Sequence, residues 1–109
     1  AFYTDMGAGM ARISVLVYTE FGRRIAENGS VGTDHGTASL AYLMGGGVNG
    51  GQIISDWPGL DIGVNEDLQI TTDLRTVISE MLDKRLGGTN VGTVFPGFSG
   101  PTTANAFLT

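Results

Sequence analysis

The chain has 109 residues, no cysteine, and 11 acidic against 6 basic side chains, which give a net charge of −5. This length fits one small domain, and the acidic balance argues against nucleic acid and against anionic membrane surfaces as partners. Hydrophobic residues make up 41% and charged residues 16% of the chain, which excludes a charge-rich disordered segment. Without cysteine the chain can form neither disulfides nor thiolate metal sites, and no apolar run approaches the ~18 residues of a membrane span.

The first half of the chain contains two short apolar runs that are typical of β-strands. After the helix-like spacing of Phe2, Met6 and Met10, which indicates the frayed end of a helix, the run Ile13–Tyr18 is β-branched or aromatic almost throughout. Ser39–Met44 is the second run and ends in three glycines. Continuous apolar runs of this length fit strands that are buried on both faces, as in a parallel sheet.

The segments around these strands are rich in turn formers. Thr19–Thr37 is polar and contains the tight-turn dipeptide Asn28-Gly29. A second Asn-Gly dipeptide precedes Gly50–Ser55, which we therefore expect to form a short edge strand or hairpin arm. Asp56–Asp67 indicates a solvated acidic loop that Trp57 anchors.

Asp73–Leu86 carries the clearest helical pattern in the chain. Its apolar side chains recur with the spacing of one helix face and predict a stripe for the core, made of Leu74, Val77, Ile78, Met81 and Leu82. Thr71 or Thr72 can cap the start of this helix, and Asp73 complements the positive end of its dipole. Gly87 can adopt the left-handed conformation that ends a helix.

The whole pattern indicates an α/β fold with few strands and one long helix over about residues 73–86. We expect residues 1–98 to form a single α/β domain, in which Phe95–Phe98 holds down the loop after Gly88, and residues 99–109 to form a loop-like C-terminal tail. Two buried strands and one long helix do not cover a parallel sheet on both faces, and 18 glycines are many for so small a domain. The sequence therefore reads as a piece of a larger protein.

His35 is the candidate site residue that stands out. It is the only histidine, it follows Asp34, and Gly32 and Gly36 bracket the pair just before the second predicted strand. Carboxylate oxygen and imidazole nitrogen are ligands for divalent cations. Glu20 adds a carboxylate just after the first predicted strand, at the edge where open α/β sheets bind ligands. The alternative is a structural histidine whose imidazole caps backbone carbonyls.

Several motifs in fixed order carry a resemblance that extends from about Phe2 to Phe98. These motifs are Thr19–Arg23, Asn28-Gly29, Gly32–Gly36, Gly45–Val48 with Gly50-Gly51, Asp56–Leu60, Thr71–Arg75 and Phe95–Phe98. With them the chain resembles a bacterial family of unknown function, domain of unknown function 1501, within the alkaline phosphatase and sulfatase superfamily. It covers only the C-terminal part of that family's usual length.

The resemblance implies a doubly wound α/β fold with a site for divalent metal ions (zinc, manganese or magnesium) at the strand ends. It aligns His35 with a late metal-binding histidine, with Asp34 and Glu20 as further ligands. Glu20-Phe21 stands where relatives usually have Asp-His, and Phe21 cannot bind a metal. The nucleophile of the superfamily would lie in an N-terminal half that this sequence does not match. The family resemblance also implies export by a twin-arginine signal to the periplasm.

Two functional hypotheses follow. In the first, the parent protein is a metal-dependent hydrolase of phosphate or sulfate esters, and this chain lacks the nucleophile and is inactive alone. In the second, the chain is a non-enzymatic exported module. A buried ion-pair network of Glu20, Arg23 and Asp34 then orders the loop from Thr19 to Gly36. In either case we expect the unpaired edge of Ile13–Tyr18 to favour a homo-oligomer or contact with the N-terminal remainder of the parent protein.

Overall fold

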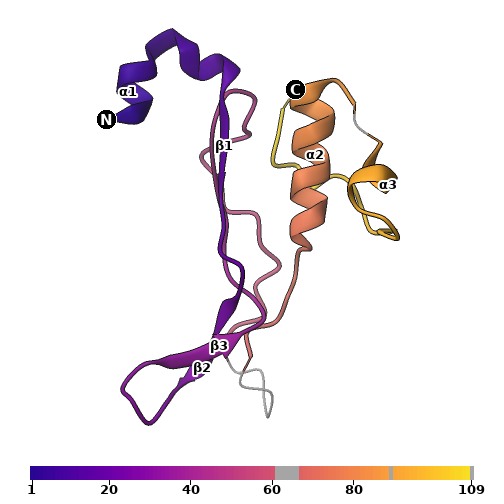
Figure 1. The fold of residues 1–109 in the computed structure, drawn as a ribbon. Helices are drawn as coiled ribbons and strands as arrows, with labels where there is room; N and C mark the ends of the chain where they lie inside the picture. The colour runs from indigo at the N-terminus through magenta and orange to yellow at the C-terminus, as the bar shows by residue number, and fades with distance from the viewer. Residues whose placement is uncertain (61–66, 89, 109) are drawn as a thin grey trace. The chain divides into compact units, whose positions relative to one another are not determined.

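The computed structural model describes the chain except for residues 61–66, 89 and 109 (Figure 1). Its internal contacts divide the chain into two compact units. One unit contains residues 1–16, 43–54 and 72–109, and the other contains residues 17–42 and 55–71. Among the described residues, no helix combines the length and the apolar character needed to cross a bilayer.

Two helical elements precede four consecutive strands and two helices follow them, which confirms a mixed helix-and-strand composition, consistent with α/β. The elements in chain order are α1 (Phe2–Met6), the 3-10 helix η1 (Gly7–Arg12), β1 (Ser14–Val17), β2 (Gly22–Glu27), β3 (Thr33–Gly36), β4 (Tyr42–Gly45), α2 (Leu74–Leu86) and α3 (Val91–Val94). β1 pairs with β4, and β2 pairs with β3, so the described strands form two separate two-stranded sheets.

The two apolar runs form β1 and β4, as their sequences predict, but they are less buried than expected. β1 is half-buried along three residues and exposed at Val17, and β4 alternates between exposed and half-buried positions. The prediction that both strands are buried on both faces is therefore wrong, because no position of either strand is fully buried.

The glycines at the end of β4 allow a close backbone approach. The Gly46 amide donates to the carbonyls of Met10 and Ile13 at 3.1 and 2.7 Å. A Cβ at Gly46 would overlap the carbonyl oxygen of Ala11. Glycine is required here because any side chain would push these two backbones apart.

Helix α2 begins and ends close to its predicted limits, but a different residue caps it. Asp73 is the N-cap, and its carboxylate accepts the amide of Arg75 at 2.8 Å, so the predicted capping by Thr71 or Thr72 is wrong. Gly87 ends the helix in the left-handed conformation with φ 78°, as predicted. The Arg75 guanidinium also bonds the Asp73 carboxylate, and this hydrogen bond lowers the pKa of Asp73.

The face of α2 that is buried is polar, which the apolar stripe did not predict. Thr76, Ser79 and Glu80 are buried, whereas all five residues of the predicted stripe are only half-buried. The hydroxyls of Thr76 and Ser79 have no hydrogen-bond partner within the described part of the chain. The apolar periodicity predicted the position of the helix correctly. It did not predict which face is most buried, because the fully buried residues lie outside the apolar stripe.

The remaining loops differ from several expectations. Residues 50–55 form no strand, and Trp57 is 59% exposed and so does not anchor its loop. The predicted acidic loop lies partly outside the described residues. After α2 the chain contains the short helix α3, where we expected only loop.

The Phe95–Phe98 motif packs as predicted. Phe95 and Phe98 meet edge to face with ring centroids 6.2 Å apart, and the Arg75 guanidinium lies 4.5 Å from the Phe98 ring centre. Residues 99–108 contain no helix or strand apart from a bridge between Phe107 and Val48.

Candidate functional site

Two of the predicted site residues, Asp34 and His35, lie on strand β3 of the β2–β3 hairpin, and Glu20 lies just before β2. The strands are antiparallel, with Gly22 opposite Gly36 and Arg23 opposite His35. Asn28 closes the turn because its side-chain oxygen accepts the amides of Ser30 and Gly32 at 2.9 and 3.1 Å. The turn at Asn28-Gly29 is therefore confirmed, whereas the flanking strands were missed.

Glycine sets the close spacing of this hairpin. A Cβ at Gly36 would lie 2.6 Å from the carbonyl carbon of Arg23. A Cβ at Gly22 would overlap the carbonyl oxygen of Ala38. Real Cβ atoms do not approach backbone this closely, so both positions exclude a side chain and fix how β2 and β3 meet.

Three side chains form a stack on one face of the hairpin. His35 lies against Phe21 with ring centroids 3.9 Å apart and an interplanar angle of 28°. The guanidinium carbon of Arg23 lies 5.8 Å from the centre of the same Phe21 ring. The ring of His35 is thus held by an aromatic contact, and Arg23 supplies a cation beside it.

Asp34 is held by a different contact. Successive residues of a strand point to opposite faces, so Asp34 is directed away from the His35 stack. Its carboxylate accepts the side-chain amide of Asn28 at 2.8 Å. Asp34 and His35 are both exposed. Asp34 contacts Asn28, whereas His35 contacts Phe21.

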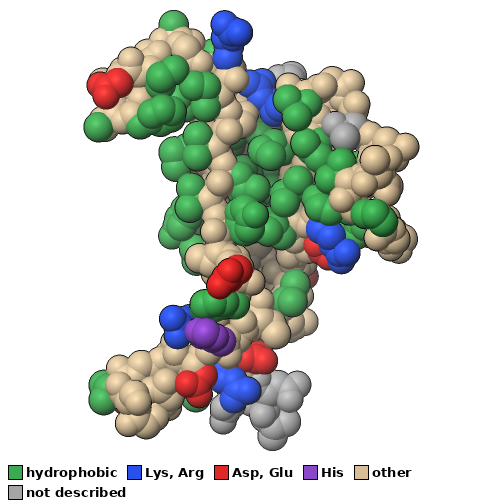
Figure 2. Space-filling view, in the orientation of Figure 1, with side chains coloured by type: hydrophobic (Ala, Val, Ile, Leu, Met, Phe, Trp, Pro, Cys, Tyr) green, Lys and Arg blue, Asp and Glu red, His purple; other side chains and the backbone are tan. Residues whose placement is uncertain are grey.

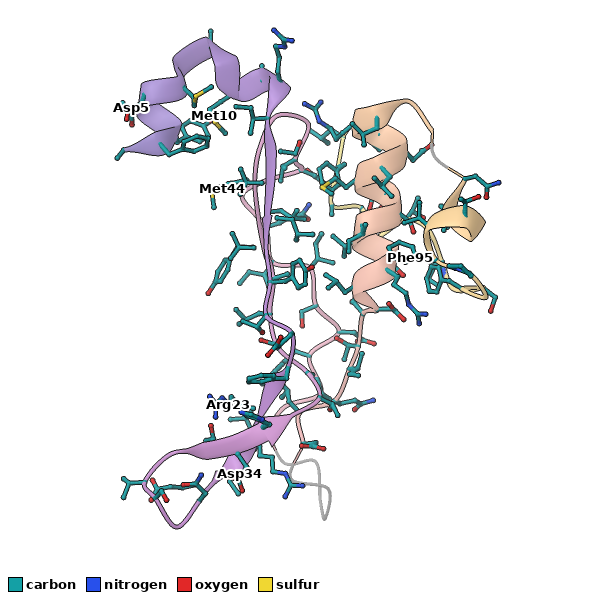
Figure 3. All side chains as sticks on the ribbon, viewed as in Figure 1. Asp5, Met10, Arg23, Asp34, Met44 and Phe95 are labelled. Atoms are coloured by element: carbon teal, nitrogen blue, oxygen red, sulfur yellow. The ribbon has the colours of Figure 1, made fainter. Side chains whose placement is uncertain are left out.

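An open hollow of about 590 Å³ is bordered by six polar residues of the hairpin, which are Arg23, Arg24, Asn28, Thr33, Asp34 and His35. Figure 2 shows basic and acidic side chains gathered around the histidine, and Figure 3 shows Arg23 and Asp34 on the two strands. Arg24 forms an ion pair with Asp67, with its Nε 3.6 Å from the carboxylate oxygen. The hollow therefore combines two guanidinium groups, one imidazole and one carboxylate.

The donor set for a metal ion is incomplete in the part of the chain that the structure describes. There, no group of three or more His, Cys, Asp or Glu side chains converges to hold an ion. Glu20 lies exposed in the bend before β2 and does not join Asp34 and His35. These residues alone do not fit a closed metal centre, which needs about three or four converging protein ligands.

The polar contacts of Arg23 differ from the ion-pair network of the second hypothesis. Its guanidinium donates to the backbone carbonyl of Thr33 at 2.6 Å. Asp34 is engaged by Asn28, and the residues involved are exposed. These hydrogen bonds order the hairpin locally. Arg23 binds a backbone carbonyl and Asp34 binds a side-chain amide, whereas we expected Arg23 to pair with the carboxylates of Glu20 and Asp34.

Sequence reasoning missed three functional-site contacts: the Phe21–His35 stack, the Asn28–Asp34 hydrogen bond and the Arg24–Asp67 pair. The first two depend on the hairpin register. Alternation of side chains along β2 and β3 could have revealed them, but the polar composition of these strands gave no strand signal.

The fold and the site together define a mixed helix-and-strand protein that carries a polar hairpin with a charged hollow. Residues 1–91 match the family described as protein of unknown function (DUF1501), and the chain belongs to this family. A comparison with curated proteins found no match. A comparison with solved structures found none either.

Proposed function

We propose that the β2–β3 hairpin is one part of the active site of a longer metal-dependent hydrolase of phosphate or sulfate esters. The observation that carries the proposal is the hollow itself, which gathers the Asp34–His35 pair with Arg23 and Arg24. Carboxylate and imidazole are the ligand types that zinc and manganese accept. Guanidinium groups are suited to the oxygens of phosphate and sulfate.

Residues in the hairpin and just before it have distinct roles in this proposal. His35 is a metal ligand, and Phe21 orients its imidazole ring as an outer contact to a ligand does. Asp34 is a second ligand, which requires its carboxylate to leave the Asn28 amide and turn toward His35. Arg23 and Arg24 border the hollow where the ester group is bound. Glu20 is a further carboxylate ligand, which requires the bend before β2 to close toward the hairpin.

The missing components belong to residues outside this sequence. Divalent ions, when bound, stabilise the attacking and leaving oxygens of an ester displacement. That chemistry needs further ligands and a nucleophile, and we propose that both come from the N-terminal remainder of the parent protein. The doubly wound sheet of the alkaline phosphatase superfamily is proposed for that parent, together with twin-arginine export to the periplasm. The chain alone is then inactive.

Calorimetric titration of the parent protein with zinc and with manganese tests this function. We expect saturable binding that is lost in His35→Ala, and phosphatase or sulfatase turnover that the same substitution abolishes. Thr37→Ala, which changes an exposed residue just after β3, is the matched control and should bind metal normally. Metal binding and turnover that are unchanged in His35→Ala would refute the proposal.

A structural role for the hairpin is the second candidate. The hydrogen bonds from Arg23 to Thr33 and from Asn28 to Asp34 are internal to the hairpin and favour it. In that case zinc and manganese do not bind, and Arg23→Ala disorders the hairpin. Thermal unfolding of Arg23→Ala beside the metal titration separates the two candidates.

Self-association is proposed as well. β1 has β4 as its sheet neighbour and β4 has β1, which leaves one edge of each strand without a strand partner in the described part of the chain. Unpaired edges favour pairing with another chain. Light scattering that shows a monomer at high protein concentration would contradict this.

A further inference from the structure

The C-terminal segment 104–108, called the strap below, contains two of the three buried hydrophobic residues in the described part of the chain. Ala106 and Phe107 are 2% and 5% exposed, and Met10 is the only other hydrophobic residue buried to this degree among the residues that the structure describes. The strap lies beyond residues 1–91, which match the family. A segment that the sequence predicts as a loop-like tail therefore supplies two buried hydrophobic residues, Ala106 and Phe107.

One side of the strap is bound by the turn after β4. Leu108 donates its amide to Gly47, and the amide of Asn49 donates to Ala106, at 2.8 and 2.9 Å. The side-chain amide of Asn49 donates to the Asn105 carbonyl at 3.1 Å. The strap is thus paired on this side much as an added strand is paired in a sheet.

The other side of the strap is bound by a single carboxylate. Glu80 of α2 is 2% exposed. Its Oε2 accepts the amides of Ala104 and Ala106 at 2.6 and 3.2 Å, and its Oε1 accepts the amide of Phe107 at 3.3 Å. A buried carboxylate needs such donors to offset its lost hydration.

The backbone of the strap is shaped to present these amides. Asn105 has a positive φ of 58°, which is uncommon for a residue other than glycine and which Asn tolerates best. A left-handed residue between neighbours of ordinary conformation turns successive N–H groups toward one point. Such concave arrangements of backbone amides bind anions.

We propose that residues 104–107 form a backbone anion site whose resident ligand is the carboxylate of Glu80, and that the strap closes on α2 only while a carboxylate occupies this site. The site recognises the charge and the two oxygens of a carboxylate, so a small free carboxylate can replace the Glu80 side chain. The inference is independent of the function proposed for the hairpin.

Amide hydrogen exchange on the full 109-residue chain tests the proposal. We expect protected amides at Ala104, Ala106 and Phe107 in the wild-type chain. In Glu80→Gln these amides should exchange about ten- to a hundredfold faster, because the substitution removes the charge and replaces one acceptor oxygen with a donor group. Asp83→Asn, which neutralises an exposed carboxylate of the same helix, is the matched control and should leave the exchange unchanged.

Chemical rescue provides the second measurement. In Glu80→Ala, sodium formate should restore protection of the three amides, whereas sodium chloride of equal ionic strength should not. Helical circular dichroism verifies that α2 persists in each variant. The exchange pattern of the wild-type chain tests, without any substitution, whether the strap is bound to α2. Unprotected amides in the wild-type chain, unchanged protection in Glu80→Gln, or no formate-specific rescue in a folded Glu80→Ala would each overturn the proposal.

Discussion

The imidazole of His35 lies flat against the phenyl ring of Phe21, with ring centroids 3.9 Å apart. Phe21 stands where the family resemblance implies a metal-binding histidine, and its ring cannot bind a metal. It contacts instead the one imidazole of the chain. In the function proposed above, Phe21 supports the imidazole ligand and supplies no ligand itself.

Phe21→Leu tests this contact. The substitution keeps an apolar side chain but removes the ring stack, so we expect the hairpin to lose about 0.5–1.5 kcal/mol of stability. The measurement is amide exchange of β2 and β3. Phe2→Leu, at an exposed aromatic residue in the other unit, is the control, and an equal loss of hairpin protection in both variants would contradict the role of the stack.

The glycines of the hairpin should differ sharply in their tolerance of a side chain. Gly22→Ala places a Cβ against the Ala38 carbonyl oxygen, so we expect loss of the β2–β3 pairing. A Cβ at Gly29 meets nothing within 4 Å, so Gly29→Ala should be neutral or raise stability by up to about 1 kcal/mol. Nuclear magnetic resonance of the hairpin amides distinguishes the two, and a native hairpin in Gly22→Ala would show that the close approach is not required.

Asp73 should make the stability of α2 depend on pH in the acidic range. The hydrogen bond from Arg75 lowers the pKa of Asp73 below the ordinary value of 3.8. A group with a lowered folded-state pKa contributes stability that is present above its unfolded pKa and is lost as the pH falls through the folded pKa. We therefore expect this contribution at neutral pH and its loss below pH 3.8.

Matched variants isolate the Asp73 effect. Asp73→Ala removes the cap and should cost about 0.5–2 kcal/mol at neutral pH. Asp73→Asn keeps a capping oxygen but does not titrate, so the acid-dependent part should disappear from helical circular dichroism measured against pH. Equal acid sensitivity in the wild-type chain and Asp73→Asn would assign that sensitivity to other carboxylates.

Removal of the Ser79 hydroxyl and removal of the Ser14 hydroxyl should have different effects on the stability of the fold. Ser79 is fully buried and its hydroxyl has no partner among the described residues, so Ser79→Ala should be neutral or stabilise by up to about 1 kcal/mol. Ser14 donates to Gly46 and accepts from Arg85, at 2.7 and 2.9 Å. Ser14→Ala leaves both groups unpaired and should cost about 1–3 kcal/mol in denaturant unfolding; the reverse order would contradict these assignments.

Local signals in the sequence predicted the local features of the fold. The spacing of Leu74 to Leu82 located α2, Gly87 marked its end, and the β-branched residues of Ser14–Val17 identified β1. Each of these features depends on neighbours within one helical turn or one strand. They are therefore visible without knowledge of the tertiary contacts.

The features that the sequence did not predict depend on distant contacts. β2 and β3 are polar, and their pairing depends on glycines that admit close backbone approach at Gly22 and Gly36. Glu80 is buried because backbone amides 24 to 27 residues away converge on it. A charged residue on a helix normally indicates a solvent-exposed face. The amides that bind Glu80 belong to the backbone, so the pattern of side chains in the sequence does not reveal them.

The adjacency of Asp34 and His35 puts both residues on β3, but it does not determine which ligands meet. Glu20 follows β1 as predicted, yet in the described chain it does not join the pair. Whether three donors meet depends on how the bend before β2 closes, which is a property of tertiary packing rather than of spacing.

The most direct measurement of the proposed site is anomalous diffraction at the zinc absorption edge from crystals of the parent protein grown with zinc. We predict a peak within bonding distance of an imidazole nitrogen of His35 and of an Asp34 carboxylate oxygen, about 2.0–2.2 Å. A zinc peak bound entirely by other residues, with the His35 ring still stacked on Phe21 and remote from the metal, would contradict the proposed role of the hairpin.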